Sequence, residues 1–311
     1  MTDSSPPPGP RPPPPPARPP AGPVATLPVF ATVAGAFRSA LLENIRYLPR
    51  AALSPVVISL LLFLLQVRFG LTEVPSEEEP AAVNMTGNLL FSLAGLVPYV
   101  MFAVAWHRLI LFGPQRGLPS YLPSWGTRHW LFLAYMFAIG IVLFLPFLGA
   151  DVVGRAVLGS ASQGPAESGQ SAALLVLLWI AVAVFAGWLA SRLSFVLPAR
   201  AIDESYGLGD SWRQTRGQGF RILAAVILVN LAILLPSLVV GGLLGAGGGV
   251  VGGINAMGQA HLLEAAILFI GVLPLLLLGF LAAYLATALG VTVLSIAFRT
   301  CSGWTAHAGG V

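Results

Sequence analysis

Six long apolar segments follow one another along this chain, and they constrain its fold more than any other feature. They cover residues 51–69, 89–112, 131–150, 172–197, 222–242 and 262–298. About 20 apolar residues suffice for a helix to cross roughly 30 Å of hydrocarbon. Only 9% of all residues are charged, against about a quarter in soluble domains. The sequence therefore predicts an all-α, polytopic transmembrane helical bundle in residues 31–299, with the lipid bilayer as its surroundings.

The sixth segment is longer than one perpendicular crossing requires. Pro274 lies within it and can kink a helix, but no loop-forming residues divide the segment into two crossings. We therefore predict one tilted or protruding helix. With six spans in total, Arg299 then lies on the same side of the membrane as most other arginines.

The arginines are unevenly distributed between the two sets of loops. The chain has no lysine, and 14 of its 16 arginines lie in or beside alternate loops, leaving Arg68 and Arg155 on the other side. Because positively charged loops stay in the cytoplasm, both termini are predicted to be cytoplasmic. Arginine in place of lysine is typical of GC-rich coding and indicates a bacterial inner-membrane protein. Six tryptophans lie toward the same face, where indoles anchor helices: Trp106, Trp125, Trp130, Trp188, Trp212 and Trp304.

Two segments precede the first span. Residues 6–23 contain 12 prolines, which favours an extended, solvated conformation, so residues 1–30 are predicted to be a disordered cytoplasmic tail. A docking site for a proline-binding partner is the alternative. Residues 33–48 carry Phe37, Leu41, Ile45 and Leu48 at helical spacing, which predicts an amphipathic helix lying at the membrane interface. Residues 300–311 form a second, short cytoplasmic tail.

The first, third and fifth spans are each preceded by a segment of similar composition. Residues 37–50, 119–130 and 210–221 each supply arginines and aromatic residues directly before an outward-going helix. This pattern predicts three helical hairpins of parallel orientation. Membrane proteins built from repeats place a ligand site at the repeat interface. The alternative is that inward loops of bacterial membrane proteins share this composition without being repeats.

Small and polar residues within the spans are candidates for helix packing. Gly187 lies between Ala183 and Ser191 at four-residue spacing, a pattern that lets helix backbones approach closely in lipid. Asn230 is the deepest strongly polar side chain, and we predict a bond between helices for it. Gly241 and Gly245 begin a run of glycines spaced by four, which fits either a smooth helix face or an outer loop.

No catalytic, cofactor or metal site is predicted. The run Gly209-Asp210-Ser211 resembles the nucleophile block of a lipase and esterase class, but no aspartate precedes a later histidine by three residues. Asp210 is instead predicted to cap a short helix over residues 211–216, with Gly217 ending it. Cys301 is the single cysteine, which excludes a disulfide framework and a cysteine-based metal site. The basic residues form no single patch, so nucleic acid is not an expected partner.

Two runs around the fourth span carry a family resemblance. Residues 192–198 read RLSFVLP, residues 207–217 read GLGDSWRQTRG, and Trp106-His107-Arg108 ends the second span. The chain resembles the six-helix bacterial inner-membrane family that includes YciC-like proteins and the membrane domain of glycerophosphoryl diester phosphodiesterase. The resemblance implies a membrane component concerned with lipids or the envelope. The phosphodiesterase activity is not expected, because only about a dozen residues follow Arg299.

The candidate residues and functions follow from these patterns. Arg108 and Arg192 lie close enough to the inner face to extend their charges to it. With residues of the 207–217 run they are candidates for contact with the interface or a partner: Arg108, Arg192, Trp212, Arg213 and Arg216. The first hypothesis is a non-enzymatic membrane protein acting through helix packing, a membrane-protein partner or second copy, or the lipid environment. The alternative is a transporter or permease subunit, because proline occurs in or at the end of every span. A membrane-embedded enzyme is the weakest hypothesis.

Overall fold

The computed structural model describes residues 26–68, 81–117, 121, 124–161, 168–234, 238 and 273–305. All regular secondary structure in these ranges is helical. The predictions for the proline-rich segment, for Gly241 and Gly245, and for the last six residues of the chain lie outside the described residues.

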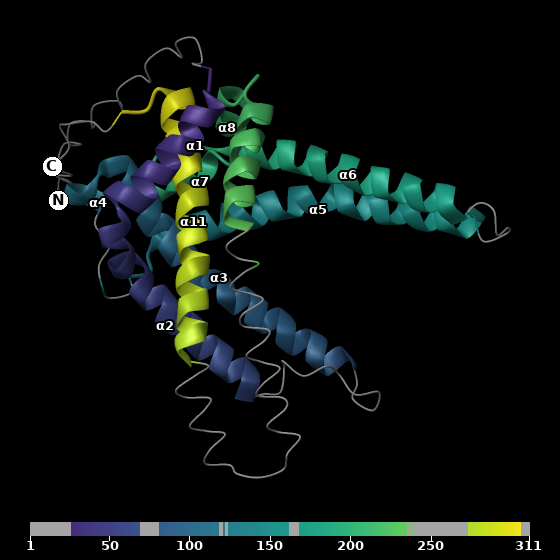
Figure 1. The fold of residues 1–311 in the computed structure, drawn as a ribbon, viewed down its shortest axis with the longest axis horizontal. Helices are drawn as coiled ribbons and strands as arrows, with labels where there is room; N and C mark the ends of the chain where they lie inside the picture. Colours follow the sequence, from purple (N-terminus) through teal and green to yellow (C-terminus); the bar gives the residue numbers. More distant parts are fainter. Residues whose placement is uncertain are drawn as a thin grey trace, which may run out of the picture.

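Five long helices dominate the fold (Figure 1): α2 (Leu48–Arg68), α3 (Ala81–Phe112), α5 (Thr127–Ala161), α6 (Ser168–Leu193) and α11 (Leu273–Ser302). Each contains a stretch long and apolar enough to cross a membrane. The helix Gly219–Leu234 follows α8 (Leu208–Gln214) at a bend of 95°, and this pair forms a sixth candidate if it is counted as one span. The chain is therefore a multi-pass helical membrane protein with five or six candidate spans in its described part.

Several span limits differ from the prediction. The third helix is longer than residues 131–150, since α5 begins at Thr127 and ends at Ala161. The fourth span is interrupted after Leu193 and continues as α7 (Val196–Ala201). Pro198 explains this interruption, because a proline ring clashes with the carbonyl group four residues earlier, here that of Ser194. The last helix ends at Ser302, four residues after the predicted limit.

The helices converge at one end of the molecule, which we call the packed end. It contains α1 (Val29–Phe37), α7, α8 and the last turns of α11, whereas the paired helices α2–α3 and α5–α6 diverge away from it (Figure 1). The largest fully buried side chains lie at the packed end and include Trp106, Phe195 and Phe298. Away from it, only 6% of the most apolar window of the fourth span is buried. The apolar surface of these arms is what a bilayer would cover.

The N-terminal helix differs from the prediction in its limits and in one residue of its apolar stripe. It begins at Val29, becomes a π-helical turn at Arg38–Glu43 and ends at Asn44, whose side-chain nitrogen donates to the Ser39 carbonyl oxygen at 2.9 Å. Its buried side chains are small: Thr32, Ala36 and Ala40. This face packs against α11. Of the predicted apolar stripe, Phe37 and Leu41 pack against the core and Leu48 is buried, whereas Ile45 is exposed. Small residues let the two helix backbones approach closely, so this helix belongs to the packed end.

Candidate functional site

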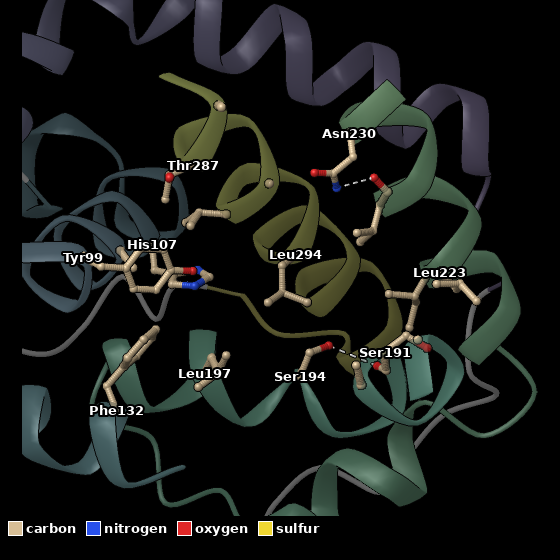
Figure 2. A pocket seen from close by; sticks show the side chains of 18 residues that line it. Tyr99, His107, Phe132, Ser191, Ser194, Leu197, Leu223, Asn230, Thr287 and Leu294 are labelled. Carbon is tan, nitrogen blue, oxygen red and sulfur yellow. Dashed lines mark hydrogen bonds between the residues drawn. The ribbon is translucent and has the colours of Figure 1, made fainter. Parts of the chain in front are cut away.

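A cavity of about 470 Å³ opens between α3, α6, α11 and the helix Gly219–Leu234 (Figure 2). Figure 2 shows His107 and Phe132 on one side of this space and Leu223 on the other. Most of the lining is apolar. The polar lining residues come from four helices: Tyr99 and His107, Ser191 and Ser194, Asn230, and Thr287.

Small residues on facing helices leave this space open. Gly187 lines it from α6, and Ala286 and Gly290 line it from α11. A Cβ atom added to Gly187 would lie 2.9 Å from Leu223 Cδ1, whereas one added to Gly290 would have no atom within 4 Å. Gly187 therefore packs against a neighbouring helix, and Gly290 borders empty space. Protein interiors are otherwise close-packed, which makes this gap a candidate binding site.

The polar groups around the cavity are engaged with the protein. His107 is buried, and its Nδ1 lies 2.8 Å from Ser295 Oγ. The Asn230 side chain donates to the Val226 carbonyl oxygen of its own helix at 2.8 Å. The Ser191 hydroxyl group bonds to the Gly219 carbonyl oxygen at 2.7 Å. The cavity thus offers an apolar surface with few free hydrogen-bonding groups, which suits an apolar ligand.

The runs at residues 192–198 and 207–217 meet at the end of α6. The Ser211 hydroxyl group is fully buried; it donates to the Arg192 carbonyl oxygen at 2.8 Å and accepts the Phe195 N–H at 3.1 Å. The Thr215 hydroxyl group accepts a hydrogen bond from Arg192 Nε at 3.0 Å. These bonds join the interrupted end of α6 to α8. The two sequence runs therefore form one structural unit.

Two tryptophans surround the Arg192 guanidinium group. It lies 4.0 Å from the ring centroid of Trp212 and 5.5 Å from that of Trp188, distances at which a cation is attracted to an indole face. The two indoles are packed edge to face, with centroids 5.6 Å apart. Gly219 passes close by, since a Cβ atom there would lie 2.8 Å from Trp188 Nε1. A side chain at this position would displace Trp188 or Arg192.

Asp210 was predicted to be the N-cap residue of the short helix, and this prediction is wrong. The N-cap of α8 is Gly207, and Asp210 is the third helical residue. Its carboxylate accepts the Gly207 N–H at 2.9 Å and pairs with Arg213 Nη2 at 2.5 Å. An acidic residue in the first turn is favourable because it faces the positive end of the helix dipole. Gly217 follows the helix with φ of +76°, the conformation typical of a helix end.

The remaining arginine candidate belongs to a separate ionic cluster. Arg108 Nη1 lies 3.2 Å from Asp203 Oδ2, and Arg128 Nη2 lies at the same distance from that oxygen. Arg108 also donates to the Ala201 carbonyl oxygen at 3.2 Å. This cluster joins the end of α3 to the start of α5 and the end of α7. The sequence offered no indication of Asp203, whose position follows from a left-handed backbone conformation (φ of 64°) after α7.

Comparison with family models, curated proteins and solved structures finds no match to this chain. The resemblance to YciC-like proteins thus remains a prediction from the short runs themselves. In the described ranges no three histidine, cysteine, aspartate or glutamate side chains are grouped as metal ligands. The apolar lining of the cavity and the arginine and tryptophan side chains around Arg192 are therefore the features from which a function is inferred.

The cavity itself was not predicted from the sequence. Tyr99, Phe132 and Leu294 are lining residues that no sequence pattern distinguished from other apolar side chains. The available signal was the small-residue stripe at 183–191, together with Ala282, Ala286 and Gly290, which have the same four-residue spacing in the last span. Their spacing indicated close helix contact, but it could not indicate that the stripes would border a common space.

Proposed function

We propose that this chain is a non-enzymatic membrane protein that acts on its lipid environment by admitting a lipid acyl chain into the cavity. The observation that carries this proposal is an apolar space of about 470 Å³ between helices whose outer surfaces are themselves apolar. Ligand pockets commonly enclose roughly 300–1,000 Å³. An acyl chain has the apolar character that this lining favours, and the arms of α5 and α6 place lipid beside it.

Filling the cavity tests this proposal. We expect Gly290→Leu to place its side chain in the empty space, because no atom lies within 4 Å of a Cβ atom there. Displacing two methylene groups of a bound chain would cost about 1.6 kcal/mol at about 0.8 kcal/mol each, or about fifteenfold in affinity. The readout is crosslinking of a phospholipid with a photoactivatable acyl chain to the reconstituted protein, mapped to Leu223 and Leu294 by mass spectrometry.

Gly149→Leu is the matched control for this experiment. Gly149 lies within α5, a Cβ atom there also meets no atom within 4 Å, and the residue does not line the cavity. Crosslinking at the cavity should fall in Gly290→Leu and stay unchanged in Gly149→Leu. Equal crosslinking in both variants and the unmodified protein would contradict an acyl chain in the cavity.

The proposal includes an orientation in the membrane. We propose six spans arranged as three hairpins, with both termini on the cytoplasmic side of a bacterial inner membrane. The sorting of arginines supports this orientation, as does the gathering of Trp188, Trp212 and Arg192 near one end of α6. In a Cys301→Ala background, a membrane-impermeant thiol reagent should label Arg155→Cys from outside the cell. The reagent should label Arg299→Cys only after permeabilisation, and the reverse pattern would refute the orientation.

A transporter is the second candidate function. The cavity extends to Asn230, and Pro55, Pro98 and Pro146 lie within long helices, where proline permits local bending. Proteoliposomes containing the protein would then show flux of a small apolar or amphipathic solute, and Gly290→Leu would reduce it. Acyl-chain crosslinking without flux would support the first proposal over this one.

A further inference from the structure

Arg192 is a buried cation without a carboxylate partner. Its residue exposure is 8%. Nε donates to the Thr215 hydroxyl group at 3.0 Å, and Nη2 donates to the Trp212 carbonyl oxygen at 2.6 Å. In the part of the chain that the structure describes, nothing accepts a hydrogen bond from Nη1, and no acidic side chain forms an ion pair with Arg192. Buried charges are ordinarily paired, because removing them from water is costly.

Arg216 adds a second positive charge without an acidic partner beside Arg192. Arg216 is exposed and directly follows Thr215, whose hydroxyl group accepts a hydrogen bond from Arg192 Nε at 3.0 Å. No acidic partner of Arg216 is present within the described ranges. The nearby carboxylate of Asp210 is already bound to Arg213 and to the Gly207 amide. Two arginines thus lie at the junction of α6 and α8, and neither forms an ion pair with an acidic side chain in the described ranges.

The side chains around Arg192 are of the kinds found at a lipid headgroup region. Trp212 is 39% exposed and Phe220 is 65% exposed, and both rings pack against Trp188. Tryptophan is enriched where headgroups meet the hydrocarbon core, and these rings lie at the end of an apolar helix. Arginine binds phosphate through several N–H groups in a planar fork. A phosphate group at this position would receive donors from the protein and remain close to the aqueous surface.

We propose that Arg192 and Arg216 bind the phosphate group of an anionic phospholipid, with the indole rings of Trp188 and Trp212 beside it. Nη1 of Arg192 and the guanidinium group of Arg216 donate to the phosphate oxygens. Neither Arg192 nor Trp188 lines the cavity between the helices, so this site is separate from the proposed acyl-chain site. It supplies a lipid-selective contact that the cavity alone does not, and it stands whether or not the cavity holds an acyl chain.

The test uses Arg216→Gln in the full-length protein, because Arg216 is exposed and the hydrogen bonds of Arg192 to α8 stay intact. Arg299→Gln is the matched control: Arg299 is an exposed arginine in the last turn of α11. Phosphatidylglycerol bound to the detergent-solubilised protein is measured by native mass spectrometry, with phosphatidylcholine as the zwitterionic reference. We expect Arg216→Gln to weaken phosphatidylglycerol binding about tenfold, as for the loss of one charge-assisted donor, and Arg299→Gln to leave it unchanged.

A second arm separates a lipid headgroup from free phosphate. Tryptophan fluorescence is titrated with inorganic phosphate and, separately, with short-chain phosphatidylglycerol. A response to the lipid at much lower concentration than to phosphate, lost in Arg216→Gln, supports a headgroup site. A response to both at similar concentration, again lost in Arg216→Gln, supports the phosphate chemistry but assigns it to the free ion. Equal losses in Arg216→Gln and Arg299→Gln, or no loss in either, would overturn the proposal.

Discussion

Ser211→Ala should destabilise the protein by breaking the connection between α6 and α8. The Ser211 hydroxyl group is fully buried, donates to the Arg192 carbonyl oxygen at 2.8 Å and accepts the Phe195 N–H at 3.1 Å. In the variant, the single hydrogen of the Thr215 hydroxyl group is shared between the Ser211 carbonyl oxygen at 2.7 Å and the Arg192 carbonyl oxygen at 3.1 Å. The Phe195 N–H has no other acceptor among the described residues, so it becomes a buried, unsatisfied donor.

The size of the effect follows from the loss of the only described acceptor of the Phe195 N–H. A buried donor without a partner costs about 1–3 kcal/mol, and the Arg192 carbonyl oxygen adds less because it shares the Thr215 hydroxyl hydrogen. We therefore expect the free energy of unfolding to fall by about 2 kcal/mol. For larger single domains, a loss of 1 kcal/mol lowers the melting temperature by about 2–4 °C. The apparent melting temperature should therefore fall by about 4–8 °C.

The assay is thermal unfolding of the purified protein in detergent, followed by intrinsic fluorescence at one fixed scan rate because unfolding of such proteins is often irreversible. Thr287→Ala is the control. Among the described residues, the Thr287 hydroxyl group bonds only to the Ala283 carbonyl oxygen of its own helix, so no described N–H loses its acceptor. Hydrogen exchange at the Phe195 amide should also become faster in Ser211→Ala. If Ser211→Ala melts within about 1 °C of Thr287→Ala, the reasoning about the unsatisfied amide is refuted.

Three further predictions concern other contacts. Gly117→Ala should lower the melting temperature, because its Cβ atom would overlap the Arg108 backbone; Gly95→Ala, in open space, should not. Asp203→Asn keeps a residue type that tolerates the left-handed conformation. It should lower the free energy of unfolding, measured by thermal unfolding, by less than about 1 kcal/mol, because the ion pairs that it removes are partly exposed. The effect should be smaller at high salt, which screens these pairs. Gln218→Ala should speed hydrogen exchange at the Leu27 amide, which donates to Gln218 Oε1 at 3.1 Å; unchanged exchange would contradict that contact.

The helices were predictable because their signals are local. Apolar composition identifies each membrane-length segment regardless of what surrounds it, and five such helices are present in the described residues. Their ends were less predictable. The break after Leu193 depends on Pro198 and on the hydrogen bond between Phe195 and Ser211. The proline is visible in the sequence, but the hydrogen bond exists only once α8 has packed against the end of α6.

The candidate site shows the same division. The runs at 192–198 and 207–217 marked Arg192, Trp212, Arg213 and Arg216 as notable residues. Sequence spacing could not show that Arg192 would be buried without a carboxylate while Arg213 would be paired with Asp210. That difference arises because Arg192 lies in the last turn of α6 between two tryptophan rings, whereas Arg213 lies on α8 within one turn of Asp210.

By itself, the sequence determined that this chain belongs in a membrane, because 9% charged residues cannot cover a soluble surface. It also determined which loops are basic, and from them it predicts the orientation. Only the tertiary structure decided that the small residues of α6 and α11 border a shared cavity and that the N-terminal helix packs on α11 through Thr32, Ala36 and Ala40. These features depend on contacts between residues far apart in the chain, such as the bond between Leu27 and Gln218 across 191 positions. No local pattern encodes such a contact, because it exists only once the helices have packed.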